Sequence, residues 1–143
     1  MCKAFFLVFS LLSMIFTQGA IADDYGTSQN TPISLMVMVS FPDSSTTFQP
    51  PADVAAVLDD ARAASLIYIN GRTSTNRPSA RDEILALKRA LSARRYLVDR
   101  GVAPLKVMVN FASATDYVTE NITPEGRYQN QRVEIELIYA PIL

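Results

Sequence analysis

The sequence contains no histidine and no tryptophan, and its single cysteine is Cys2. Without histidine the chain lacks the commonest general base and a usual zinc ligand. A lone cysteine cannot form an intramolecular disulfide. The five glycines are scattered, and none belongs to a glycine-rich phosphate-binding motif. Any site must therefore be built from carboxylates, hydroxyls, amides, lysine and arginine, and no metal or cofactor is expected.

The first 22 residues have the pattern of a cleavable signal peptide. Lys3 supplies a positive charge, residues 4–16 are almost continuously apolar, and Ala20-Ile21-Ala22 has the small residues that signal peptidase reads. The apolar run is shorter than the roughly 20 residues that a membrane-spanning helix needs. We therefore expect cleavage after Ala22, no transmembrane anchor, and no lipid attachment, because Cys2 leaves with the signal. The expected location is a bacterial periplasm, where a partner would associate the protein with the outer membrane.

The remaining chain, 121 residues long, suits one domain. Residues 23–32 are polar and aperiodic and are expected to be a flexible leader, so that the domain spans 33–143. Once Lys3 is removed, 12 basic and 14 acidic side chains leave a formal charge of −2. This charge argues against a nucleic acid partner. Residues 72–100 nevertheless hold seven arginines and Lys88 against three acidic residues. That segment either meets an anion or forms a well-solvated helix.

Hydrophobic patterns predict four strands. The continuous apolar run at 33–41 predicts a strand buried on both faces, whereas the alternation at 132–139 predicts a strand with one face toward water. Further strands are expected at 66–70 and 105–111. The segment that follows the third strand, up to residue 131, is expected to be a loop.

Helical periodicity predicts two helices, at 52–64 and 82–100. The second is expected to bear an apolar stripe, with small residues beside it and charged residues outside it. The order β-α-β-α-β-loop-β implies an α+β fold with helices packed on one side of a mixed sheet. The stripe consists of Ile84, Leu87, Leu91 and Val98, and the residues beside it are Ala86, Ala90, Ala93 and Leu97.

Three motifs occur in order along this pattern. They are GRTS at 71–74, DEILALKRALSARRYLVDRGV at 82–102, and GRYQNQRVEI at 126–135. Together they resemble the OmpA-like peptidoglycan-binding domain, which has GHTD, NxxLSxxRAxxVxxYLxxxGV and GRxxNRRVEI at these places. The resemblance runs from about residue 39 to residue 137. It implies a β-α-β-α-β-β sandwich and a non-catalytic module of the Gram-negative cell envelope.

The resemblance also implies a ligand. In the family, the aspartate of GHTD and the arginine of LSxxRA hold the two ends of diaminopimelate in the peptidoglycan stem peptide. The arginine carries over onto Arg89, whose planar guanidinium suits a carboxylate, but Ser74 replaces the aspartate. Losing one charge-assisted contact lowers affinity roughly ten- to a hundredfold. The peptidoglycan-binding residues expected on this basis are Thr73, Ser74, Asp82, Arg89, Asn130 and Arg132.

Asp82 offers a substitute for the missing charge. It lies seven residues before Arg89, so the two side chains share a helix face about 10 Å apart along the axis. We hypothesise that Asp82 supplies the negative charge of the site and Arg89 the positive one. The alternative is that Asp82 only stabilises the helix N-terminus and that Arg89 is a surface residue.

These observations bear on three classes of function, of which the first is favoured, the second is the alternative and the third is poorly supported. The first is a non-catalytic module that binds the peptidoglycan stem peptide and, with an envelope protein partner, tethers an envelope structure to the wall. The second is a structural subunit of an envelope-spanning secretion or conjugation assembly that has lost diaminopimelate binding, as Ser74 suggests. The third, an enzyme, would depend on a carboxylate pair, and no motif places one.

Overall fold

The structure is a computed structural model that describes residues 31–141. The expected signal peptide (1–22) and residues 23–30 of the expected leader therefore lie outside the described residues. Four strands and three α-helices alternate along the chain, with a short 3-10 turn after α1 and another before β3. The elements are β1 (Ile33–Ser40), α1 (Ala52–Asp59), β2 (Leu66–Arg72), α2 (Ala80–Asp99), β3 (Val107–Ala112), α3 (Pro124–Asn130) and β4 (Arg132–Tyr139).

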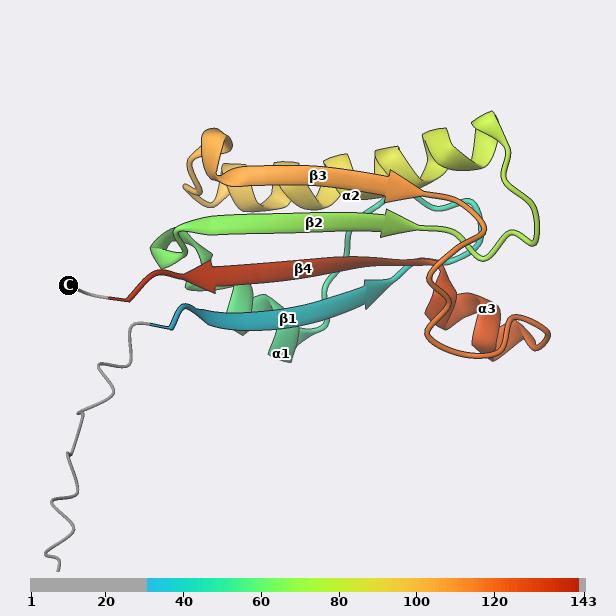
Figure 1. The fold of residues 1–143 in the computed structure, drawn as a ribbon, viewed down its shortest axis with the longest axis horizontal. Helices are drawn as coiled ribbons and strands as arrows, with labels where there is room; N and C mark the ends of the chain where they lie inside the picture. The colour runs from blue at the N-terminus through green and yellow to red at the C-terminus, as the bar shows by residue number, and fades with distance from the viewer. Residues whose placement is uncertain (1–30, 142–143) are drawn as a thin grey trace, which may run out of the picture.

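The four strands form one mixed sheet in the order β1-β4-β2-β3. β4 pairs antiparallel with both β1 and β2, and β2 pairs parallel with β3. The chain passes from β2 to its parallel neighbour β3 through α2, as a same-direction connection requires. Figure 1 shows the C-terminal ends of β1, β2 and β3 at the same end of the sheet, next to α3 and the start of β4. The predicted mixed α+β fold is confirmed.

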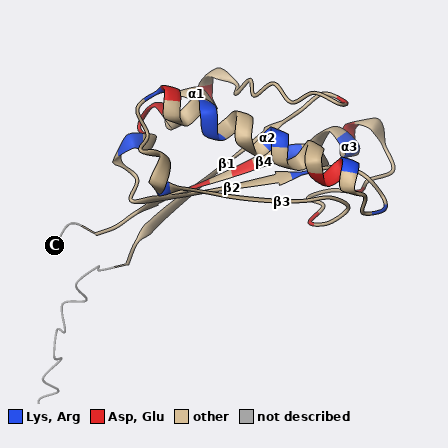
Figure 2. Ribbon diagram, turned by 90° about the horizontal axis from the view of Figure 1, so that it is seen from above, with Lys and Arg blue, Asp and Glu red and all other residues tan. Residues whose placement is uncertain are grey.

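Helices α1 and α2 cover one face of the sheet, and α3 lies at its end (Figure 2). The core between these layers is formed by alternate residues of the strands, among them Val133, Ile135 and Leu137 of β4, each fully buried. The predicted inward face of β4 is therefore correct, and its bounds match the predicted range. On the opposite face, which was expected to meet water, Arg132 is buried and Glu134 and Glu136 are half-buried. Among residues 31–141, no helix has the length and hydropathy to cross a membrane.

The buried face of α2 differs from the predicted stripe. Ala86, Ala90, Ala93 and Leu97 are fully buried, whereas Ile84 and Leu91, two residues of the predicted stripe, are about half exposed. Small side chains face the sheet because α2 approaches β2 closely. A Cβ added at Gly71 would lie 2.1 Å from the backbone oxygen of Ala86, so β2 needs glycine at this crossing.

Three further expectations need correction. β1 is not buried on both faces, because α1 and α2 cover one face of the sheet only (Figure 2); it is also an edge strand, and most of its side chains are exposed. The first helix ends at Asp59 rather than at residue 64 and continues as a 3-10 turn. The expected loop before the last strand contains α3, which Thr123 caps by accepting a hydrogen bond from the backbone of Gly126.

Candidate functional site

Arg89 is fully buried at the end of the sheet where β2 ends and β4 begins. Its guanidinium makes four hydrogen bonds, three of them to backbone carbonyls. The acceptors are the oxygens of Ser45 (3.0 Å), Arg72 (3.2 Å) and Pro42 (3.4 Å), and Oε1 of Gln131 (3.1 Å). Arg89 therefore fastens the loop between β1 and α1 to the sheet and to α2.

A carboxylate and an aromatic ring lie near the charge of Arg89. Gln131 accepts from Arg89 and donates through Nε2 to Oδ1 of Asp43 at 2.7 Å, which links the cation to a carboxylate. The guanidinium also lies 5.2 Å from the ring centroid of Phe41, a cation–π distance. Burial lowers the pKa of Arg89 to about 10, and the charge of Asp43 opposes that shift. Arg89 thus stays cationic at neutral pH.

The structure separates Asp82 from Arg89. Asp82 lies in the first turn of α2, where its backbone N–H donates to Oγ of Ser79 at 3.1 Å and its carboxylate accepts from the same hydroxyl at 2.5 Å. Arg89 points inward instead of outward, so the expectation that it lies outside the buried arc, or on the surface, is wrong. The first-turn role of Asp82 is the alternative that the sequence had left open, and the capping contacts are consistent with it.

Asn130 and Ser74 are joined through a third residue. Asn130 is fully buried, and its side-chain oxygen accepts from the backbone N–H groups of Val118 and Thr119 at 2.9 and 3.3 Å. Its amide nitrogen donates to Oδ1 of Asn121 at 3.1 Å, and Asn121 donates in turn to the backbone oxygen of Ser74 at 2.5 Å. Asn130 therefore ties the segment before α3 to the turn after β2.

Arg132 and Thr73 are also engaged inside the fold. Arg132 is 2% exposed and donates to the backbone oxygen of Asp116 at 2.6 Å and to Glu134. Arg72, buried beside it, donates to the carboxylate of the same Asp116 at 2.9 Å. Thr73 is buried and shares a 3.0 Å hydrogen bond with Thr75. Of the residues expected to bind peptidoglycan, Ser74 and Asp82 alone are partly exposed, and neither lies against Arg89.

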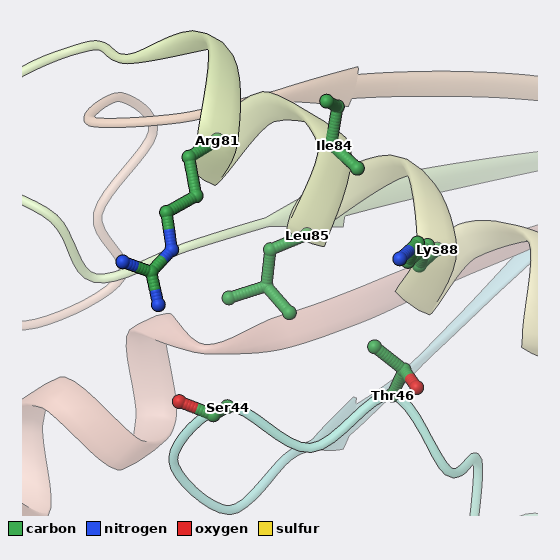
Figure 3. A pocket seen from close by; sticks show the side chains of 6 residues that line it. All are labelled: Ser44, Thr46, Arg81, Ile84, Leu85 and Lys88. Carbon is green, nitrogen blue, oxygen red and sulfur yellow. The ribbon is translucent and has the colours of Figure 1, made fainter.

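A pocket of about 340 Å³ opens between the β1–α1 loop and the first half of α2. Arg81, Leu85 and Lys88 extend from α2, and Ser44 and Thr46 extend from the loop (Figure 3). Ile84 completes the lining. The four helix residues share one face because they are three, four and seven positions apart.

The pocket is cationic and contains no carboxylate. Arg81 and Lys88 are exposed, and within the described part of the chain neither forms a salt bridge. Ser44 and Thr46 add hydroxyl donors, and Ile84 and Leu85 add an apolar wall. Such a lining can bind a carboxylate that has an aliphatic group beside it, because hydrogen bonds between ionised groups are stronger than those between neutral groups. Across residues 31–141, no cluster of three acidic, cysteine or histidine residues could hold a metal ion.

Sequence reasoning missed several residues that shape this region. Gln131 stands where the third family motif has an arginine, but no sequence pattern indicates that it bridges Arg89 and Asp43. Asp116 lies in a segment without periodicity, so its contact with Arg72 had no sequence signal. Arg81 and Lys88 had one: they belong to the basic segment at 72–100 and share a helix face.

A profile of the OmpA family matches residues 41–131, more than half of this chain. The matched range includes the β1–α1 loop, β2, all of α2 and the region up to Gln131. It therefore contains the buried arginine and every residue of the pocket.

Individual proteins and structures agree with this match. A Brucella suis protein named as an outer membrane lipoprotein of a type IV secretion system is 29% identical over 109 residues, 75% of this chain and 63% of the relative. The peptidoglycan-binding protein ArfA of Mycobacterium tuberculosis is 36% identical over 84 residues, 59% of this chain and 24% of ArfA. The chain thus spans less than two thirds of either relative.

A solved structure shows the same fold. The peptidoglycan-associated lipoprotein of Burkholderia pseudomallei superposes with a TM-score of 0.61 at 23% identity, over 71% of this chain and 88% of that one. At this identity the likeness concerns the arrangement of strands and helices. It agrees with the sheet order and the helix layer described above.

Proposed function

Because this chain belongs to the OmpA family, we propose that it is a non-catalytic periplasmic module that binds the peptidoglycan stem peptide and tethers an envelope structure to the wall. The observation that carries the proposal is the cationic pocket between the β1–α1 loop and α2. Stem peptides carry free carboxylates and short aliphatic side chains. A pocket with two cations, two hydroxyls and an apolar wall suits those groups.

A non-catalytic role agrees with the lining of the pocket. Hydrolysis by a carboxylate pair would need two acidic groups facing one cavity, and none of the six lining residues is acidic. Its hydroxyls come from Ser44 and Thr46, and a nucleophilic hydroxyl needs an adjacent base. The remaining lining residues are two cations and two aliphatic side chains, which suit an anion with an apolar neighbour.

The location and the tether are parts of the same proposal. Residues 1–22 have the pattern of a signal peptide, so the mature chain would begin at Asp23. A tether needs a second attachment, and an envelope protein partner would supply it. Mass spectrometry of the protein recovered from a periplasmic fraction tests the first part, because cleavage elsewhere, or none, would contradict it.

Co-sedimentation with purified sacculi tests binding to peptidoglycan. We expect the protein to pellet with sacculi at low salt and to be released in part at high salt, because screening weakens interactions between exposed charges. Protein that stays in the supernatant at low salt would overturn the proposal.

A second function is supported by a specific observation. Ser74 stands where the family has an aspartate, and the family arginine, Arg89, is fully buried. A structural subunit of an envelope-spanning secretion or conjugation assembly would need the scaffold without the ligand contact. The name of the Brucella suis relative agrees with this alternative. It predicts no sedimentation with sacculi and co-purification with an envelope assembly after mild crosslinking.

A further inference from the structure

The β1–α1 loop separates the buried Arg89 from the exposed Arg81 and Lys88. The backbone oxygens of Pro42 and Ser45 accept hydrogen bonds from Arg89 on the inner side of the β1–α1 loop. The side chains of Ser44 and Thr46 line the pocket on the outer side, opposite α2. Arg89 therefore fixes the position of the loop that forms one wall of the pocket.

Arg89 itself is unsuited to contact a ligand in this arrangement. Its exposed fraction is zero, and its hydrogen bonds already serve two loop carbonyls, the end of β2 and Gln131. A ligand could reach it only if the loop opened, which would break the hydrogen bonds from Arg89 to the backbone oxygens of Pro42 and Ser45. Arg81 and Lys88 are exposed and do not hold the loop in this way.

The geometry points to a relocated anion contact, an inference that rests on the function proposed above. We infer that Arg81 and Lys88 bind carboxylates of the stem peptide in this pocket, while Arg89 is a positioning residue that holds the Ser44–Thr46 wall. Arg81 and Lys88 lie two helical turns apart, about 10 Å along the axis. An extended peptide covers that distance in about three residues. The preferred ligand is therefore a short peptide with more than one carboxylate.

The remaining lining favours the same class of ligand. Ile84 and Leu85 lie between the two cations on α2 and are partly exposed, so they can pack on alanine methyl groups. Ser44 and Thr46 can donate hydroxyl hydrogens to the carboxylate oxygens. Asp82 does not line the pocket, and its carboxylate is engaged with Ser79. The family site has an aspartate and an arginine, whereas this pocket has two cations, Arg81 and Lys88.

Binding of the full chain, purified after export, to sacculi and to a diaminopimelate-containing tripeptide tests the inference. The variant Arg81→Ala/Lys88→Ala is expected to bind both at least tenfold more weakly than wild type, with a smaller dependence on salt. The matched control, Arg62→Ala/Arg95→Ala, removes two exposed cations outside the pocket and is expected to bind like wild type. Arg81→Lys should restore part of the binding lost in Arg81→Ala.

The two levels of proposal fail differently. If wild type binds sacculi and Arg81→Ala/Lys88→Ala binds equally well, the pocket assignment is overturned and the proposed function stands. If wild type fails to bind sacculi and tripeptide, both are overturned. If the control loses as much affinity as the pocket variant, binding depends on overall charge and the pocket assignment is again overturned.

A conservative change tests the positioning role of Arg89. Arg89→Lys keeps the charge but loses the planar fork, so fewer loop carbonyls are held. We expect weaker tripeptide binding with the wild-type dependence on salt, measured at a temperature at which circular dichroism shows the variant folded. A reduced salt dependence, like that of Arg81→Ala, would mean that Arg89 contacts the anion directly and would overturn its assignment as a positioning residue.

Discussion

Lys88 and Arg89 are consecutive residues of α2, yet they belong to two different regions. Lys88 is exposed at the rim of a pocket and has no salt bridge within the described residues, whereas Arg89 is fully buried and makes four hydrogen bonds. A turn of about 100° per residue is enough to send one side chain outward and the other inward. Arg89 holds the scaffold in this structure, and Arg81 and Lys88 on the outer face are the cations proposed to contact a ligand.

The difference shows what separates a structural cation from a binding one. Arg89 faces acceptors that the protein supplies, namely three backbone carbonyls and Gln131, so it makes four hydrogen bonds without a ligand. Arg81 and Lys88 face hydroxyls and apolar groups, which leave their charge uncompensated. Stability should therefore depend on the first region and binding on the second.

The largest effect is expected from removing the buried cation. Arg89→Ala leaves three backbone carbonyls and Gln131 without their donor and creates a cavity, so the free energy of unfolding should fall by about 4 kcal/mol. Urea denaturation followed by circular dichroism measures this change. Arg95→Ala is the control on the same helix, because the side chain of Arg95 is 85% exposed. Equal unfolding midpoints for the two variants would contradict the structural role of Arg89.

A somewhat smaller loss should follow from separating α2 and β2. In Gly71→Ala the new Cβ would lie 2.1 Å from the Ala86 backbone oxygen, so the helix must move away from the strand. That movement also lengthens the hydrogen bond from Arg89 to Arg72. We expect the free energy of unfolding to fall by about 3 kcal/mol. Asn70→Ala, at the preceding position of β2, is the control, and the same loss there would contradict the close approach as the cause.

The loop that reaches from β3 to α3 should respond to Asn130→Ala. Asn130 is fully buried and bonds Val118, Thr119 and Asn121, so its loss should cost about 2 kcal/mol of unfolding free energy. Hydrogen exchange should show faster exchange of the Val118 and Thr119 amides. Gln129→Ala, at an exposed position of the same helix, is the control. Unchanged exchange at both amides would show that the loop is held by other contacts.

Much of the fold could be predicted from the sequence. The bounds of β4 follow from its strict alternation, and the order of elements follows from hydrophobic periods that do not depend on tertiary contacts. The errors arose where tertiary geometry decides. Periodicity predicts that the larger apolar residues of α2 face the sheet, but the close approach at Gly71 places the alanines there instead. The exposure of β1 follows from its place at the sheet edge, which periodicity cannot reveal.

The site was harder to predict because its residues are assigned by contacts between distant segments. Arg89 was singled out from a motif, but its burial depends on the carbonyls of Pro42 and Ser45, more than forty residues earlier. Backbone acceptors leave no trace in the residue types of a sequence. Asp43 and Gln131 are 88 residues apart, and no single motif contains both of them. The basic character of residues 72–100 was visible, yet the sequence could not show which cations are internally satisfied.

The smallest effect on stability is expected at the pocket, and it completes the comparison between neighbours on α2. Neither Arg81 nor Lys88 has an acidic residue three or four positions away on the outer face, so each charge contributes little to the folded state. Arg81→Ala and Lys88→Ala should each change the free energy of unfolding by no more than about 0.5 kcal/mol, measured by urea denaturation under the conditions used for Arg89→Ala. A loss above about 1 kcal/mol in either variant would show that the cation has an internal partner. In that case the division of α2 into a structural cation and two binding cations would have to be abandoned.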